Sequence, residues 1–139
     1  MLFYLACSKT LVEPSGFILS PQYPGFYAPK SNCTWLITAP ERHVVRIEVI
    51  DFQLEHDPRC ATDYLEITDG NNLQEQKLGK FCGEEIPALI ESRSNTVMIT
   101  FRSDIDIQGN GFKLHYSFRG TLTLIRISYF SLGLKSWST

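Results

Sequence analysis

The residues best suited to chemistry in this sequence are acidic. Glu55 and Asp57 follow one strand-like segment, Asp63 precedes another, and a third such segment is followed by Asp104 and Asp106. Two unpaired carboxylates about 5 Å apart repel each other by roughly 3 kcal/mol at an effective dielectric constant of about 20. If the loops that hold these acids meet, the resulting site therefore requires either a bound cation or carboxyl groups with a raised pKa.

A calcium ion would suit such a site, because it accepts about 6–8 oxygen ligands from carboxylates, backbone carbonyls and water. The spacing of the acids along the chain does not by itself bring them together. On spacing alone, separate acids on solvated loops are the simpler interpretation.

The four cysteines, an even number, predict a disulfide framework. They permit three pairings, of which we favour the most local one, Cys7 with Cys33 and Cys60 with Cys82. Each bridge would close a loop of about 25 residues and stabilise the fold by roughly 3–4 kcal/mol on the chain-entropy model. A zinc site is not expected, because no C-x-x-C pair or nearby Cys/His cluster offers the usual ligand spacing. Disulfides indicate an extracellular or secreted protein.

Composition and motifs exclude several other functions. The net charge is −2 and Lys and Arg are scattered, so nucleic acid is not an expected partner. No run approaches the roughly 18–20 apolar residues of a transmembrane segment. The chain has no nucleophile elbow, no H-E-x-x-H motif and no glycine-rich phosphate loop, so we expect no enzyme activity.

The pattern of apolar residues predicts an all-β domain. Apolar and polar side chains alternate over residues 45–49, 65–68 and 112–118, the period of half-buried strands. Residues 33–38 also have strand character. The prolines and glycine between residues 20 and 29 preclude a regular helix. Many short strands with frequent turns favour an antiparallel β-sandwich, and 139 residues suffice for one such domain.

Both ends of the chain differ from the rest. Residues 1–6 lack a basic region and are too short for a complete secretory signal, so we expect a fragment of a longer secreted protein or a missing upstream exon. Residues 121–139 contain no acidic residue and are rich in apolar, β-branched and aromatic side chains, as in aggregation-prone segments. We expect the domain to span residues 7–120. The tail beyond it is either a partner-binding or membrane-associated segment, or a truncated or alternatively spliced terminus without a role.

Several linked motifs make residues 7–120 resemble a CUB domain, an extracellular β-sandwich module with a jelly-roll-like fold. The motifs are Gly16-Phe-Ile-Leu-Ser-Pro-Gln-Tyr-Pro, Asn32-Cys-Thr-Trp-Leu-Ile, Asp51-Phe-Gln-Leu-Glu, Cys60-Ala-Thr-Asp-Tyr-Leu-Glu-Ile-Thr-Asp-Gly, Leu78-Gly-Lys-Phe-Cys-Gly and Phe101-Arg-Ser-Asp followed by Gly111-Phe. The resemblance also supports the local cysteine pairing.

The resemblance extends to the calcium-binding subset of the family. Its ligand positions correspond to Glu55, Asp63 and Asp104, and all three are acidic here. Two further positions, at which the family often has Ser and Asn, are Asp106 and Ile107. Asp106 could add a carboxylate, whereas Ile107 offers only its backbone carbonyl.

By resemblance, the expected function is calcium-dependent recognition of an extracellular protein, without catalysis. Residual negative charge at the site would capture an exposed Lys or Arg of the partner, with Tyr27, Glu55, Asp63 and Asp104 forming the partner-binding residues. The alternatives are carbohydrate or gamete-surface recognition, and a structural spacer that flanks an extracellular protease domain.

One modification site is also expected. Asn32-Cys33-Thr34 matches the N-glycosylation sequon. The middle residue is an expected disulfide cysteine beside a strand, which can hinder the modification. Asn32 is therefore the candidate glycosylation site of the chain.

Overall fold

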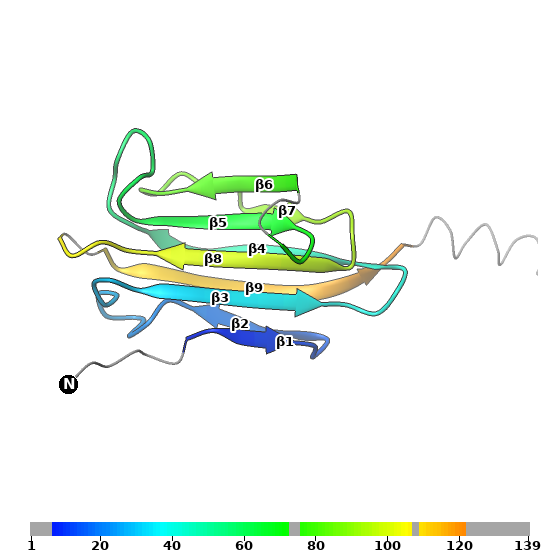
Figure 1. Cartoon of the computed structure of the whole chain (residues 1–139). Helices are drawn as coiled ribbons and strands as arrows, with labels where there is room; N and C mark the ends of the chain where they lie inside the picture. The colour runs from blue at the N-terminus through cyan, green and yellow to red at the C-terminus, as the bar shows by residue number, and fades with distance from the viewer. Residues whose placement is uncertain (1–6, 73–75, 107–108, 122–139) are drawn as a thin grey trace, which may run out of the picture.

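The computed structural model describes residues 7–72, 76–106 and 109–121 (Figure 1). These residues form nine strands and no helix, so none of them belongs to a helix that could cross a membrane. The strands are β1 (Lys9–Leu11), β2 (Ser15–Leu19), β3 (Asn32–Thr38), β4 (His43–Gln53), β5 (Tyr64–Asp69), β6 (Gln76–Phe81), β7 (Leu89–Glu91), β8 (Thr96–Arg102) and β9 (Gly111–Gly120).

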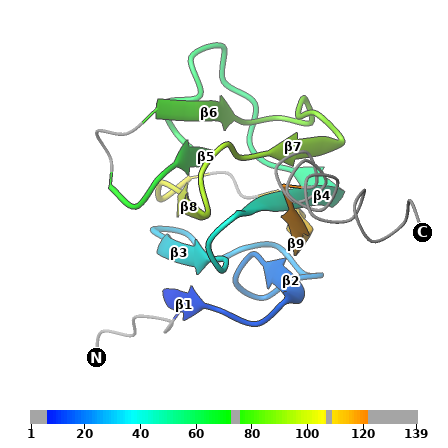
Figure 2. The same ribbon diagram turned by 90° about the vertical axis from the view of Figure 1, so that its right-hand side faces the viewer.

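The strands form two sheets packed face to face. One sheet has the order β1-β3-β8-β5-β6 and the other the order β2-β9-β4-β7. Figure 2 shows the two sheets end-on as two layers. The predicted β-sandwich is thus confirmed, with one departure from the antiparallel pattern, because β1 pairs with β3 in parallel. The two residues that precede this short strand tie it to β3. Cys7 forms the disulfide bond to Cys33, and the Ser8 hydroxyl accepts a hydrogen bond from the Thr34 N–H (3.0 Å).

The core lies between the sheets and consists of the inward-facing half of each alternating segment. In the antiparallel partners β4 and β9, for example, Val45, Ile47 and Leu114 are fully buried. Aromatic rings continue the core toward one end of the sandwich, where Phe101 makes edge-to-face contacts with Phe112 and with the ring of a buried tyrosine, Tyr27. This contact links the core to the loops at that end.

The cysteines pair as expected, Cys7 with Cys33 and Cys60 with Cys82. The second bridge joins the β4–β5 loop to the residue that follows β6. Backbone hydrogen bonds between Gly83 and residues 54 and 55 reinforce this junction (2.8 and 3.3 Å). The bridge therefore fixes the segment that contains Glu55.

The connecting segments are grouped at the two ends of the sandwich. Residues 20–31, 54–63 and 103–106 lie at one end, which we call the site end (left in Figure 1). The turns at residues 39–42, 70–72 and 92–95 lie at the opposite end. Residues 1–6 and 122–139 lie outside the described residues, so the expected domain limits remain a prediction. Thr121 still hydrogen bonds to the Arg42 carbonyl (2.8 Å).

Candidate metal centre

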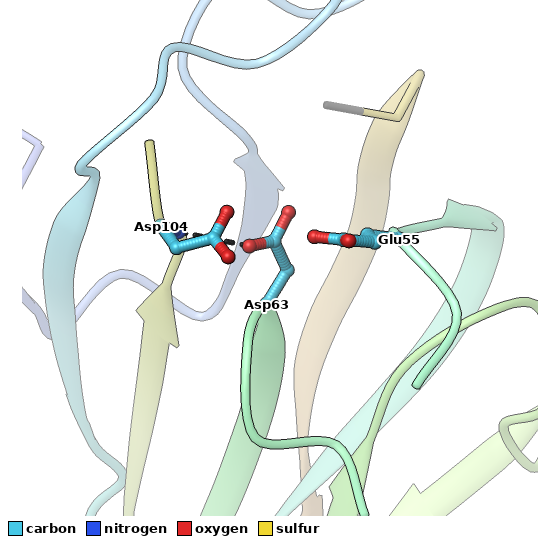
Figure 3. A group of neighbouring side chains, drawn as sticks. All are labelled: Glu55, Asp63 and Asp104. Atoms are coloured by element: carbon cyan, nitrogen blue, oxygen red, sulfur yellow. Dashed lines mark hydrogen bonds between the residues drawn. The ribbon is translucent and has the colours of Figure 1, made fainter. Parts of the chain in front are cut away.

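Three acidic side chains converge at the site end. Glu55 follows β4, Asp63 directly precedes β5 and Asp104 follows β8, and one oxygen of each carboxylate lies within 4.8 Å of the others. Figure 3 shows the Asp63 carboxylate between the other two. Two oxygens bound to one Ca²⁺ at about 2.3–2.6 Å can be no more than about 5 Å apart, so this spacing suits a single ion.

The sheet register explains why Asp63 and Asp104 meet. Antiparallel pairing places Tyr64, the first residue of β5, opposite Arg102, the last residue of β8. Residues just outside these two strand ends must therefore be neighbours. The Asp104 N–H donates to Asp63 Oδ1 (2.9 Å), and the Asp104 carbonyl accepts from the Lys30 N–H (2.9 Å). These bonds hold Asp104 in the position that follows from the register.

Tyr27 supports the carboxylates from within the core. Its hydroxyl donates to Asp63 Oδ2 and accepts from the Glu55 N–H (3.1 Å). Burial and the hydrogen bond to Asp63 raise the pKa of Tyr27, so the hydroxyl keeps the proton that it donates. The side chain is only 1% exposed. The predicted place of Tyr27 among the partner-binding residues remains a prediction, and in this structure its hydroxyl positions Asp63 and Glu55.

Burial and charge repulsion raise the pKa values of two carboxyl groups of the cluster. Burial, followed by the charges of Asp104 and Asp63, raises the pKa of Glu55. Burial also raises the pKa of Asp63, and its hydrogen bonds from the Tyr27 hydroxyl and the Asp104 N–H offset this only in part. Both directions mean that the ionised cluster lacks sufficient positive charge.

One oxygen of the cluster also lacks a hydrogen bond. Within the described part of the chain, Glu55 Oε1 is buried without a hydrogen-bond partner. The nearby side chain of Thr62 lowers the pKa of Glu55. The Thr62 hydroxyl oxygen is nevertheless also buried without a hydrogen-bond partner of normal geometry. A buried acceptor left unpaired costs about 1–3 kcal/mol. An oxygen-seeking cation between the three carboxylates would remove this cost, so the donor set fits Ca²⁺.

The two additional ligand positions differ from the main three. The Asp106 N–H donates to Asp104 Oδ1 (3.1 Å), but the exposed Asp106 carboxylate does not belong to the group of close oxygens. Its charge still contributes to the raised pKa of Glu55. Ile107 lies outside the described residues. Ligation by either residue therefore remains a prediction.

The neighbouring acid Asp57 has a different role. Its carboxylate accepts from the Ala61 N–H (2.6 Å) and weakly from the Arg59 N–H (3.4 Å), and these bonds lower its pKa. Asp57 thereby shapes the loop between Glu55 and Cys60 without joining the cluster. The spacing of the acids could not separate these roles. In the structure Glu55, Asp63 and Asp104 form one group, whereas Asp57 accepts hydrogen bonds from backbone N–H groups.

Ser103 has a structural role at the site that was not predicted from the sequence. Its hydroxyl accepts from the Ser31 N–H (2.8 Å) and donates to the Ala28 carbonyl (2.9 Å). It therefore ties the loop that contains Tyr27 to the end of β8. The signal was its position inside the Phe101-Arg-Ser-Asp motif, beside Asp104.

The candidate glycosylation residue Asn32 is exposed at the first position of β3, at this same end.

Comparison with known proteins agrees with this architecture. Cubilin of Sus scrofa is 38% identical over 112 residues, which is 81% of this chain and 3% of that protein. The full extracellular region of zebrafish Gpr126/Adgrg6 matches with a TM-score of 0.76 and 31% identity, over 84% of this chain and 15% of that one. The chain thus spans only a small part of these larger relatives.

A smaller solved structure matches the domain almost from end to end. It is the MASP-1 CUB2 domain bound to Ca²⁺, with a TM-score of 0.70 and 33% identity, over 78% of this chain and 96% of that one. The family model for the CUB domain matches residues 7–116, most of the chain. The nine-stranded sandwich, its two disulfides and these matches lead to one conclusion: the chain belongs to the CUB domain family.

Proposed function

We propose that this chain is a non-catalytic, calcium-dependent protein-recognition module in which Glu55, Asp63 and Asp104 hold one Ca²⁺ ion. The observation that carries the proposal is the convergence of three carboxylate oxygens within 4.8 Å of one another. In addition, Glu55 Oε1 is buried without a hydrogen-bond partner among the described residues. The similarity to a MASP-1 CUB2 domain bound to Ca²⁺ supports it.

When bound, the ion would neutralise the repulsion between the three carboxylates. The chain itself already supplies the framework, because Tyr27 links Glu55 to Asp63 and a backbone N–H links Asp63 to Asp104. These contacts join the β2–β3, β4–β5 and post-β8 segments at one end of the sandwich. Calcium would therefore order the surface that these segments form, with Asp106 available as an additional acidic group.

The charge that remains suits a basic partner. Three carboxylates and one Ca²⁺ leave a net charge of about −1. None of the described residues forms an ion pair with Glu55, Asp63 or Asp104. An exposed Lys or Arg of an extracellular protein would supply the missing cation and fix the orientation of the complex. Two disulfides and the similarity to the extracellular region of a zebrafish protein support that compartment.

Titration calorimetry with CaCl₂ on the oxidised protein tests the metal site. The wild type should bind one ion, and Asp104→Ala should weaken binding by at least about tenfold, because affinity follows the number of charged ligands. Glu84→Gln is the matched control, since it removes an exposed acid next to Gly83 without touching the cluster. Absence of any binding at millimolar calcium would contradict the proposal.

A second experiment tests the partner class. A lysine-containing peptide should bind the calcium-loaded wild type better than the same peptide with an acetylated lysine, and chelation of calcium should abolish the difference. If soluble glycans bind at the same residues and the lysine peptide does not, the module recognises carbohydrate instead.

A further inference from the structure

A recess lies at the site end, on the side of the four-stranded sheet. Its volume is about 370 Å³, within the range of about 300–1,000 Å³ typical of ligand pockets. Three parts of the chain line it: the Tyr23-Pro24 turn, the end of β4 and the start of β9. The lining residues are Tyr23, Pro24, Asp51, Phe52, Gln53, Asn110 and Gly111.

An irregularity of β4 directs Asp51 into this recess. The pairing of β4 with β9 shifts register between Val49 and Asp51. Such bulges rotate the side chains that follow them and often occur beside functional sites. Asp51 is exposed, and its Oδ2 atom accepts a hydrogen bond from the Tyr23 hydroxyl. Oδ1 accepts no bond from any described residue, so one carboxylate oxygen is free.

Lys113, the residue paired with Asp51 across the two strands, does not form an ion pair with it. Lys113 lies opposite Asp51 in the β4–β9 pairing, but its ammonium group is 4.8 Å from the centre of the Phe17 ring. Asp51 forms no ion pair with any residue that the structure describes. The recess therefore presents an unpaired carboxylate beside an aromatic ring and two side-chain amides.

This recess adjoins the metal centre. Gln53, one of its lining residues, is only two positions before Glu55, and the Gln53 side chain accepts from the Asn110 N–H (2.7 Å). Next to the lining residue Asn110 in the sequence, the Gly109 carbonyl accepts from the Tyr27 N–H (3.3 Å). Asp51 and Glu55 are four residues apart, so their Cα atoms are at most about 14 Å from each other.

We propose that this recess binds a second basic side chain of the protein partner, with arginine preferred over lysine. This inference rests on the proposed function, because it assumes a partner that presents basic residues. The guanidinium group would donate to Asp51 Oδ1 and stack on the Tyr23 ring, since arginine combines both contacts in one planar group. The partner's first basic residue would lie beside the calcium site.

The lining favours a cation over other ligands. Asp51 is the only charged lining residue, which disfavours an anion. A polar pocket of about 410 Å³ at the opposite end provides a contrast. There Arg93 is part of the lining, and both oxygens of Asp69 already accept hydrogen bonds from residues 93 and 94. Of these two pockets, the recess at Asp51 is the one that combines a free acceptor with an aromatic ring.

The first test uses Nα-acetyl-arginine amide as the probe and NMR of the ¹⁵N-labelled full chain as the readout. Titration should shift the backbone amides of Gln53, Asn110 and Gly111, in calcium and in EDTA alike, because no proposed metal ligand lines the recess. Asp51→Asn should raise the apparent Kd about tenfold, the loss expected for one charge-assisted hydrogen bond. Nα-acetyl-citrulline amide, the neutral analogue of the probe, should give much smaller shifts.

The second test links the two sites. In calcium, the peptide Lys-Gly-Ser-Gly-Arg, blocked at both ends, should bind more tightly than versions with either basic residue acetylated or replaced by citrulline, through an increased effective concentration. Asp51→Asn should reduce its affinity to that of the lysine-only peptide, whereas EDTA should reduce it to that of the arginine-only peptide.

The outcomes separate the two proposals. If, in the presence of calcium, the lysine adds nothing to the affinity while the arginine probe still binds, the calcium-site proposal alone is contradicted. If the arginine amide causes no shifts at these residues at tens of millimolar, or if citrulline and arginine probes bind equally, the recess does not recognise a cation. Shifts of the same amides by neutral methyl glycosides, without shifts by the arginine probe, would assign the recess to carbohydrate and overturn the inference.

Discussion

Strand β5 has a buried aspartate at each end, and the two have opposite environments. Asp69, at the last position of the strand, accepts hydrogen bonds from the Arg93 N–H (2.7 Å), the Ser94 N–H (3.1 Å) and the Ser94 hydroxyl (2.6 Å). Asp63, just before the strand, accepts from the Tyr27 hydroxyl and the Asp104 N–H, but it also lies against two other carboxylates.

The pKa directions express this difference. Burial tends to raise the pKa of Asp69, but the hydrogen bonds from Ser94 and Arg93 outweigh burial and lower it. At Asp63 burial prevails, and the pKa is raised. A buried aspartate surrounded by donors stabilises the turn that it binds. A buried aspartate that faces other carboxylates instead lacks a compensating cation among the described residues.

The largest expected effect concerns the donor-rich end. Asp69→Ala should lower the free energy of unfolding by about 3 kcal/mol, because it leaves three partly buried donors without their charged acceptor. The loss should be the same in calcium and in EDTA, since Asp69 is at the end away from the metal centre. Urea denaturation in both buffers measures it.

The control for this experiment is Glu85→Ala, which removes an exposed acid and should change stability by no more than about 0.5 kcal/mol. A loss from Asp69→Ala that appears only in the presence of calcium would mean that the two ends are coupled, and the comparison would fail.

The next effect concerns the carboxylate-rich end. Calcium at 100 times its Kd should raise the free energy of unfolding of the wild type by about 2.7 kcal/mol, because the ion binds the folded state. Asp69→Ala should retain this gain, whereas Asp63→Asn should lose it. Urea denaturation with and without calcium checks both variants. An equal calcium gain in Asp63→Asn would remove Asp63 from the proposed site.

Much of the fold could be predicted from periodicity, because strands with one buried face alternate clearly. Val45 and Ile47 in β4 and Leu114 in β9 are buried as their alternation indicated. The three-residue strands β1 and β7 could not be predicted in this way. Such segments are too short for a period, and their pairing depends on neighbours distant in sequence. For β1 the neighbour is β3, to which the preceding Cys7 is also joined by a disulfide bond, and for β7 it is β4.

The site was predicted through family motifs more than through spacing. Spacing could not separate Asp57 from Glu55, because the distinction depends on backbone N–H groups that only the folded loop directs at Asp57. It also could not show that Tyr27 is buried, since its loop has no regular period. The recess at Asp51 depends on a register shift in β4, which the alternation of that segment does not reveal.

A smaller effect is expected from the hydroxyl that connects core and site. Tyr27→Phe should keep the ring contact with Phe101 but leave the Glu55 N–H without an acceptor and Asp63 with one donor fewer. We expect a loss of about 1–2 kcal/mol in the free energy of unfolding and a calcium affinity between those of the wild type and Asp104→Ala. Urea denaturation and calorimetry measure the two quantities.

Tyr116→Phe is the matched control, because this buried tyrosine has no hydrogen bond from its hydroxyl to any described residue. It should change neither stability nor calcium affinity appreciably. If both substitutions have the same effect on calcium binding, the Tyr27 hydroxyl does not position the ligands.

The smallest effect is a difference in pH dependence that separates the two aspartates. The folded-state pKa of Asp69 is lowered from 3.8, so its contribution to stability is present above pH 3.8 and is lost as the pH falls through the lower, folded-state value. In calcium-free buffer, the stability of Asp69→Asn should therefore fall less steeply than that of the wild type below pH 3.8. The difference cannot exceed about 1.4 kcal/mol per pH unit, the limit for one proton.

Asp63 and Glu55, with raised pKa values, act in the opposite direction at higher pH: without calcium, stability should fall as the pH rises through their folded-state values. Because the wild type and Asp69→Asn both retain Asp63 and Glu55, subtracting one pH–stability curve from the other isolates the contribution of Asp69. Parallel curves below pH 3.8 would show that its carboxylate is no better stabilised in the folded state than in the unfolded chain.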